Sequence, residues 1–223
     1  MEEKLDLRRL NTMTQTDATR AHITPAIARQ MLEAGNKRFL DKTQVNRDLL
    51  QQVKETSGEK GSQKPYATIL HCIDSRASAE IIFDQGIGDI FSIRIAGNII
   101  NTDILGSMEF ACKLTGTKIL MVLGHTSCGA VGGAINGAEL GVLTSMLSKI
   151  RPAVNAVKQP DAAADRTSKN TKFVNEVSKK NVEMSIQRIL NESAVLAKMV
   201  ADKEIMIIGG MHDITTGKVT FYD

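Results

Sequence analysis

The segment YATILHCIDSR, residues 66–76, joins an apolar run to a group of reactive and charged side chains. The run YATILHC (66–72) is almost continuously apolar, which is typical of a parallel strand covered on both faces. Cys72, Asp74 and Arg76 then follow at alternate positions, so an extended backbone would turn all three to one side. A packed core does not favour such a face, and the segment therefore predicts a functional site where a strand ends.

Three more apolar runs of this kind predict strands: DIFSIRI (89–95), KILMVLGH (118–125) and EIMIIGG (204–210). Helical patterns lie near residues 77–86, 102–115, 127–135, 139–158 and 172–202. A last run, KVTFY (218–222), follows the turn residues TTG closely and predicts an antiparallel hairpin with the strand before it. The order predicts an α/β fold with a mostly parallel central sheet. It has four parallel strands and an antiparallel C-terminal edge strand, and helices flank it.

The N-terminal part of the chain predicts an extension followed by a helical arm. The extension is residues 1–23, of which residues 1–22 are polar and are expected to lack a core face of their own. Thr24 and Pro25 have the pattern of an N-cap and a first helical residue, and the helix continues to Leu40. With a second amphipathic stretch, residues 24–58 form the arm. Residues 24–223 are expected to form a single domain.

The overall composition limits the classes of partner. A net charge of +3 in 223 residues, without basic and aromatic residues interleaved, argues against nucleic acid binding. No stretch reaches the roughly 18 apolar residues of a membrane span, and the charged N-terminus does not resemble a secretory signal. Three cysteines are an odd number, which argues against a disulfide framework. We expect a cytoplasmic protein in which cysteines serve a metal or catalysis.

Cysteine and histidine side chains follow the ends of two predicted strands. Cys72 ends the first, and HTSCG (125–129) ends the third. Sites in parallel sheets collect at the carboxyl ends of strands. His125 and Cys128 are three residues apart, so a tight turn can direct both to one point. Together with Cys72 they predict a tetrahedral Zn²⁺ site with an open fourth position. His71 should point to the opposite face, and Cys112 is expected to be a core residue.

Asp74 has two alternative roles at such a site. Its carboxylate could take the fourth position on the metal, or it could pair with Arg76 and leave that position to water. A plain surface ion pair is the other interpretation of these two residues. Two thiolates and a neutral imidazole cancel the charge of Zn²⁺, so bound water should be acidified less than at a three-histidine site. Activity is therefore expected to rise toward alkaline pH.

The paired motifs CIDSR (72–76) and GHTSCGA (124–130) resemble the zinc-site motifs of the β-class carbonic anhydrases. The resemblance extends to MLEAGNKRFL (31–40), RIAGN (94–98) and GGMHDITTGKV (209–219), and covers most of residues 25–223. It implies zinc-dependent, reversible hydration of CO₂ to bicarbonate and a proton, with zinc hydroxide attacking CO₂. One zinc ion per subunit would be held by Cys72, His125 and Cys128. Asp74 and Arg76 would form the catalytic dyad, and Asp74 would bind zinc only in a closed state.

The resemblance also implies a substrate pocket at a subunit interface. Its residues would be Gln63, Phe91, Ala96, Phe110 and Gly129. The family assembles as homodimers or dimers of dimers, so Gln63 and Phe91 can serve the neighbouring subunit's zinc.

Several positions depart from the family pattern, which puts the rate and the pocket shape in doubt. Phe110 and His212 stand where tyrosines are common, and Ile95 replaces a common asparagine. One subgroup builds a regulatory bicarbonate site with a tryptophan at the position of Ile69. This chain has no tryptophan, so we expect no such switch and a site that is open near neutral pH.

Two other enzyme or binding functions are compatible with the same zinc motifs. One is hydrolysis of CS₂ or COS on the same fold, and the other is a catalytically silent zinc-binding domain. The complete pair of Asp74 and Arg76, together with Gln63, argues against the silent domain. A thiol redox protein is disfavoured because the cysteines lack CxxC spacing.

Overall fold

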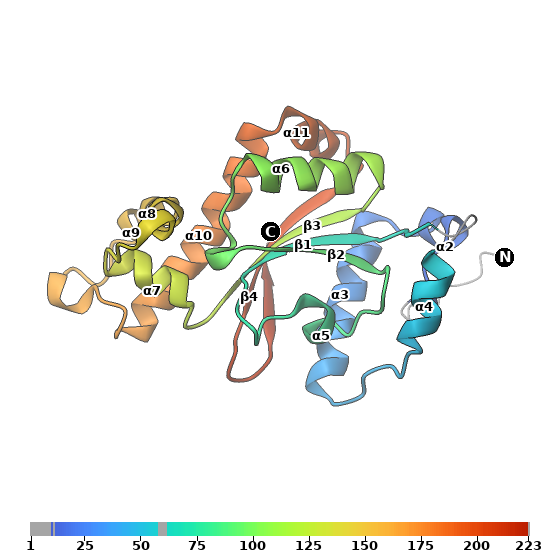
Figure 1. Ribbon diagram of the computed structural model, residues 1–223, viewed down its shortest axis with the longest axis horizontal. Coiled ribbons are helices and arrows are strands. Elements are labelled where there is room, and N and C mark those ends of the chain that lie inside the picture. Colours follow the sequence, from blue (N-terminus) through green and yellow to red (C-terminus); the bar gives the residue numbers. More distant parts are fainter. Residues whose placement is uncertain (1–9, 11, 58–61, 223) are drawn as a thin grey trace.

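The computed structural model describes residues 10, 12–57 and 62–222, and its centre is a five-stranded sheet. The strands are β1 (Ala67–His71), β2 (Ile90–Arg94), β3 (Ile119–His125), β4 (Met206–His212) and β5 (Val219–Tyr222). Their order across the sheet is β2-β1-β3-β4-β5 (Figure 1). The first four strands run parallel, and β5 runs antiparallel to β4 at the edge. The predicted fold class is confirmed.

The helices are α2 (Asp17–Ala21), α3 (Pro25–Leu40), α4 (Leu49–Thr56), α5 (Ala79–Ile82), α6 (Thr102–Glu109), α7 (Gly129–Ile135), α8 (Gly141–Ser148), α9 (Arg151–Ala156), α10 (Thr171–Glu192) and α11 (Ala194–Ala201). Short turns of other helix types occur at η1 (Ala96–Asn98), η2 (Phe110–Leu114) and η3 (Ala163–Asp165). Helices α3 and α5 cover one face of the sheet, and α6, α10 and α11 cover the other (Figure 1).

Two of the predicted helices are each divided into two. The pattern over 139–158 forms α8 and α9, because Pro152 at the start of α9 lacks the N–H that a continuous helix would need. The pattern over 172–202 is interrupted at Ser193. This residue ends α10, and its side chain accepts a hydrogen bond from the backbone N–H of Leu196 to begin α11.

Both faces of the central strands are buried, which explains their nearly continuous apolar sequences. In β1, Ile69 packs in the cluster under α3 and α5, whereas Leu70 packs in the cluster under α6, α10 and α11. A third cluster surrounds Cys72 and Cys128 with residues of α7, α8, α9 and α10, so both thiols lie in an apolar environment.

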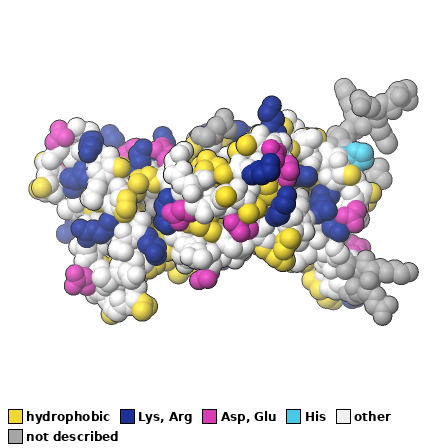
Figure 2. Space-filling model, turned by 90° about the horizontal axis from the view of Figure 1, so that it is seen from above, with side chains coloured by type: hydrophobic (Ala, Val, Ile, Leu, Met, Phe, Trp, Pro, Cys, Tyr) yellow, Lys and Arg dark blue, Asp and Glu magenta, His cyan; other side chains and the backbone are white. Residues whose placement is uncertain are grey.

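The N-terminal extension contributes to the core, contrary to the expectation that it lacks a core face. Leu10 is buried in the cluster under α3 and α5. Ile23, at the end of the extension, is buried in the same cluster, and the polar composition of the segment concealed both apolar contacts. Elsewhere the surface is mixed in charge, and Figure 2 shows Lys and Arg side chains interspersed with Asp and Glu.

Candidate metal centre

The carboxyl ends of β1 and β3 bring three potential metal ligands together. Cys72 follows β1, His125 ends β3, and Cys128 is the N-cap of α7. One ligand atom from each lies within 4.8 Å of the other two, and all three residues are buried. The two strands are hydrogen-bonded neighbours, so the sheet itself fixes the separation of the two motifs.

The imidazole of His125 is oriented for metal binding. Its Nδ1 lies 2.9 Å from the carbonyl oxygen of Thr126. Because a carbonyl can only accept, Nδ1 must carry the proton and donate it. Nε2 then carries a free lone pair. It is buried and has no hydrogen-bond partner in the described structure. A buried acceptor of this kind, next to two thiols, fits the donor set that zinc prefers.

A tight turn allows His125 and Cys128 to point to the same place. Ser127 lies in the left-handed region with a φ of 54°. Its backbone N–H donates to Oδ1 of Asn175 in α10 at 2.9 Å. The backbone N–H of Thr126 donates to the carbonyl of His212 at 2.9 Å. These bonds to α10 and β4 hold the turn in its compact form.

The two thiols lie close together and shift each other's pKa in opposite directions. A hydrogen bond from Cys128 lowers the pKa of Cys72, and a hydrogen bond from the backbone N–H of Gly97 acts in the same direction. Donation to Cys72 and burial raise the pKa of Cys128. Because zinc binds thiolates, metal binding would have to displace the proton of the Cys128 thiol.

Asp74 and Arg76 form a bidentate ion pair beside the thiols. Oδ1 of Asp74 accepts from Nε and from the backbone N–H of Arg76, both at 3.0 Å, and Oδ2 accepts from a terminal guanidinium nitrogen at 2.8 Å. These hydrogen bonds hold the pKa of Asp74 well below its usual range. Asp74 is therefore ionised and occupied by Arg76 in this structure.

Arg94 supports the same loop, a role that the sequence did not reveal. Its guanidinium donates to the backbone carbonyl of Asp74 at 2.8 Å and to that of Cys72 at 3.3 Å. Arg94 ends β2, the strand beside β1, so it reaches the loop from across the sheet. The motif RIAGN contained this residue, but backbone acceptors leave no pattern in a sequence.

Two other histidines lie close to the site in the fold. His71 is fully buried, and its Nε2 lies 3.0 Å from Oγ of Ser92, away from the three ligand atoms. His212 is buried at the end of β4, in register with His125. Burial, and secondarily the nearby His125, lowers the pKa of His212. The strand predicted over 204–210 ended two residues before β4 does, so this proximity was missed.

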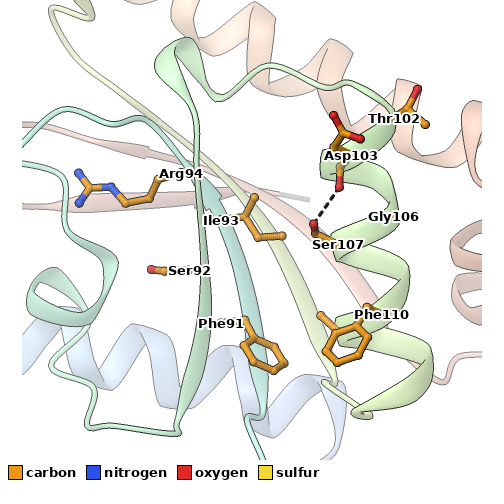
Figure 3. A pocket seen from close by; sticks show the side chains of 10 residues that line it. Phe91, Ser92, Ile93, Arg94, Thr102, Asp103, Gly106, Ser107 and Phe110 are labelled. Carbon is orange, nitrogen blue, oxygen red and sulfur yellow. Dashed lines mark hydrogen bonds between the residues drawn. The ribbon is translucent and has the colours of Figure 1, made fainter.

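The aromatic residues predicted for the substrate pocket lie away from the ligands of the same chain. Phe91 and Phe110 have ring centroids 6.5 Å apart and line an open pocket of about 740 Å³ between β2 and α6. Figure 3 shows Phe91 and Ile93 pointing from β2 toward this pocket, whereas Ser92 and Arg94 point away. The pocket lies along the exposed edge of the sheet, because β2 is an edge strand.

The remaining predicted pocket residues fall into two groups. Ala96 precedes Gly97, whose N–H contacts Cys72, and Gly129 follows Cys128, so both lie beside the potential metal ligands. Gln63 is exposed and precedes the amino end of β1. Cys72 follows the carboxyl end, and the whole strand, at about 3.3 Å per residue, lies between them.

Comparisons with known proteins identify relatives that cover most of the chain. The family model described as carbonic anhydrase matches residues 67–219. A curated carbonic anhydrase 2 of Mycobacterium tuberculosis is 33% identical over 199 residues, which are 89% of this chain and 93% of the relative. No helix in the described part of the chain is long and apolar enough to cross a membrane.

Two solved structures share the fold. The β-carbonic anhydrase CafA of Aspergillus fumigatus has a TM-score of 0.65 and 23% identity, and covers 89% of both chains. A tetrameric β-carbonic anhydrase of Sordaria macrospora has a TM-score of 0.61 and 24% identity, and covers 71% of this chain and 81% of that one.

Proposed function

This chain belongs to the β-carbonic anhydrase family, and we propose that it catalyses the zinc-dependent, reversible hydration of CO₂ to bicarbonate and a proton. The observation that carries the proposal is the buried group of Cys72, His125 and Cys128, with its free imidazole lone pair. When bound there, zinc supplies a Lewis acid that lowers the pKa of water and so provides a nucleophile. One zinc ion per subunit suits this three-ligand set.

Removing the metal is expected to remove the activity. Dialysis against dipicolinate should abolish CO₂ hydration, and stoichiometric Zn²⁺ should restore it. Mg²⁺ should not, because thiolate ligands favour softer metals than Mg²⁺. Hydration rates and bound zinc would be measured on the same samples. A fully metal-free protein that keeps its rate would contradict the proposal.

Within this function, Asp74 orients the nucleophile and gates the metal. Oδ1 of Asp74 accepts two hydrogen bonds from Arg76, whereas Oδ2 accepts one and keeps capacity for another. Oδ2 can therefore accept a hydrogen bond from the attacking water and hold its remaining lone pair toward CO₂. Release by Arg76 would free the carboxylate to bind the metal and close the site. The bidentate pairing supports a site that is open near neutral pH, as does Ile69 in place of the tryptophan of the regulated subgroup.

The substrate pocket is completed by a second subunit. Ala96 and Gly129 lie beside the ligands of their own chain, whereas Gln63, Phe91 and Phe110 lie away from them. Pairing of two chains along β2 would place these three residues at the partner's metal. The apolar rings of Phe91 and Phe110 would then exclude water from the space that CO₂ enters, and Gln63 would offer its amide to the substrate.

The helical arm, residues 24–58, contributes to the same assembly. Helix α3 packs on its own sheet, but Leu49, Leu50 and Val53 of α4 are 50%, 65% and 42% exposed. Such apolar exposure on one short helix supports packing against a partner subunit. In this proposal residues 24–223 form one domain, residues 1–23 precede it, and the unit is a homodimer or a dimer of dimers.

Mixed dimers test whether the pocket is shared. Gln63→Ala and Cys128→Ser homodimers should both be impaired, the first in the pocket and the second at the metal. A heterodimer of the two, coexpressed with different tags and purified through both, should regain one complete site. Its activity should exceed that of either parent, because one subunit supplies the zinc ligands and the other supplies Gln63.

If Gln63 serves the zinc of its own chain, no site in that heterodimer is complete and activity is not regained. The matched control is the heterodimer of wild type with Cys128→Ser. It has one intact set of ligands under either arrangement.

A further inference from the structure

The sulfur of Cys72 receives a hydrogen bond from a segment outside its own loop. The backbone N–H of Gly97 in η1 donates to Sγ at 3.3 Å. Gly97 has a φ of 67°, in the left-handed region that glycine adopts most readily. A Cβ atom at this position would lie 2.6 Å from Cδ1 of Ile150. Backbone conformation and close packing therefore both direct this N–H at the sulfur.

Asn181 holds Gly97 from the other side. Its side-chain Nδ2 donates to the carbonyl oxygen of Gly97 at 2.9 Å, across 84 positions of sequence. Asn181 is 4% exposed and lies in the middle of α10, where Val177 and Val182 are packed in two core clusters. An amide fixed on such a helix is a rigid anchor for the η1 turn.

We propose that Asn181 is a positioning residue of the metal centre, which fixes Gly97 so that its N–H stays bonded to the sulfur of Cys72. The inference rests on the proposed zinc-dependent function. A hydrogen bond from an N–H to sulfur withdraws electron density from a thiolate. The thiolate then donates less electron density to the bound metal, which is left a stronger Lewis acid. This effect has particular weight here, because two thiolates and a neutral imidazole cancel the charge of Zn²⁺.

Helix α10 supports both halves of the ligand set. Asn181 holds the turn that contacts Cys72, and Asn175 accepts from the N–H of Ser127, next to Cys128. One helix thus connects the two loops that carry the thiols. Substitution of Asn181 should therefore first change the bond between the metal and the sulfur of Cys72.

Cobalt substitution tests the proposal by a readout that does not depend on turnover. Co²⁺ bound to thiolates gives a sulfur-to-cobalt charge-transfer band in the near ultraviolet. In Asn181→Leu this band should move to lower energy, because the thiolate regains electron density. The affinity for Co²⁺ should fall about tenfold, as expected when support behind a ligand is lost. Ser185→Ala is the control, since Ser185 is equally buried one turn later in α10. It should leave the band and the affinity unchanged.

The outcomes separate this inference from the function on which it rests. A wild-type protein that binds no Co²⁺ with a thiolate band would overturn the zinc function itself. If Asn181→Leu has the wild-type band position and the wild-type affinity for Co²⁺, the positioning role is overturned and the zinc function stands. Circular dichroism checks the fold, and Asn181→Ala, judged by the same criteria, replaces the leucine variant if that variant does not fold.

Discussion

Cys128→Ser is expected to lose stoichiometric zinc and to lower CO₂ hydration by more than about 100-fold. The loss of a residue that only supports a metal ligand costs up to about that much, and the loss of a ligand itself should cost more. A serine hydroxyl is not deprotonated near neutral pH and is a poor zinc ligand, so only Cys72 and His125 would remain. Bound zinc, measured by atomic absorption after gel filtration, and stopped-flow hydration of CO₂ would be recorded together.

Cys112→Ala provides the matched control for this prediction. Cys112 is also buried and free, but it lies in the cluster under α6 and contacts Thr117 rather than the metal ligands. This variant should keep one zinc per chain and the wild-type rate per zinc. A Cys128→Ser protein with full zinc and an unchanged rate would show that the metal lies elsewhere.

Asp74→Ala should have the opposite combination of effects, with zinc retained and turnover reduced about 100-fold or more. The carboxylate is not one of the three ligands brought together here, so its removal leaves the metal in place. The catalytic loss follows because the nucleophile loses its oriented hydrogen-bond acceptor. Steady-state rates at matched zinc content measure this effect. Loss of zinc from Asp74→Ala would instead identify Asp74 as a permanent ligand.

The gating role of the pair can be separated from its orienting role by a double-mutant cycle. Arg76→Ala frees Asp74 to bind the metal and should be strongly impaired. If closure causes that loss, Arg76→Ala combined with Asp74→Ala should be at least as active as Arg76→Ala alone. If the two residues act independently, their losses should multiply. A multiplied loss would therefore count against the gate.

The sequence was sufficient to predict the fold and the grouping of Cys72, His125 and Cys128 for a specific physical reason. Parallel strands buried on both faces are apolar throughout, so β1 and β3 could be recognised. Their carboxyl ends meet at one edge of the sheet, so the motifs alone predict that Cys72 and His125 lie close together. The pattern also distinguished Cys72 from the neighbouring His71, because successive side chains of a strand point to opposite faces.

The supports of the site could not be predicted in the same way. Arg94 and Asn181 bind backbone carbonyls, and such acceptors are present at every residue. The hydrogen bond from the Gly97 N–H to Cys72 depends on a left-handed turn at Gly97. That this turn lies beside the end of β1 is known only from the fold. His212 was missed because the boundary of β4 was set two residues early. Element boundaries set by local caps, as at Ser193, are weaker signals than buried apolar runs.

The proposed roles of Phe91 and Phe110 could not be tested by the fold of one chain. Both residues line the open pocket beside the edge strand β2, away from the metal ligands of their own chain. Their proposed role depends on a partner, and pairing of identical chains leaves no periodicity in the sequence. This is why the ligands follow from sequence motifs, whereas the pocket requires the mixed-dimer experiment.

The most direct test of the central claim is stopped-flow hydration of CO₂ by purified protein with one zinc per chain, at alkaline pH. We expect a rate proportional to bound zinc, rising from neutral to alkaline pH as the nucleophile becomes available. A zinc-loaded protein that does not hydrate CO₂ under these conditions would contradict the account. Release of sulfide from CS₂ by that same sample would then identify the alternative hydrolase activity.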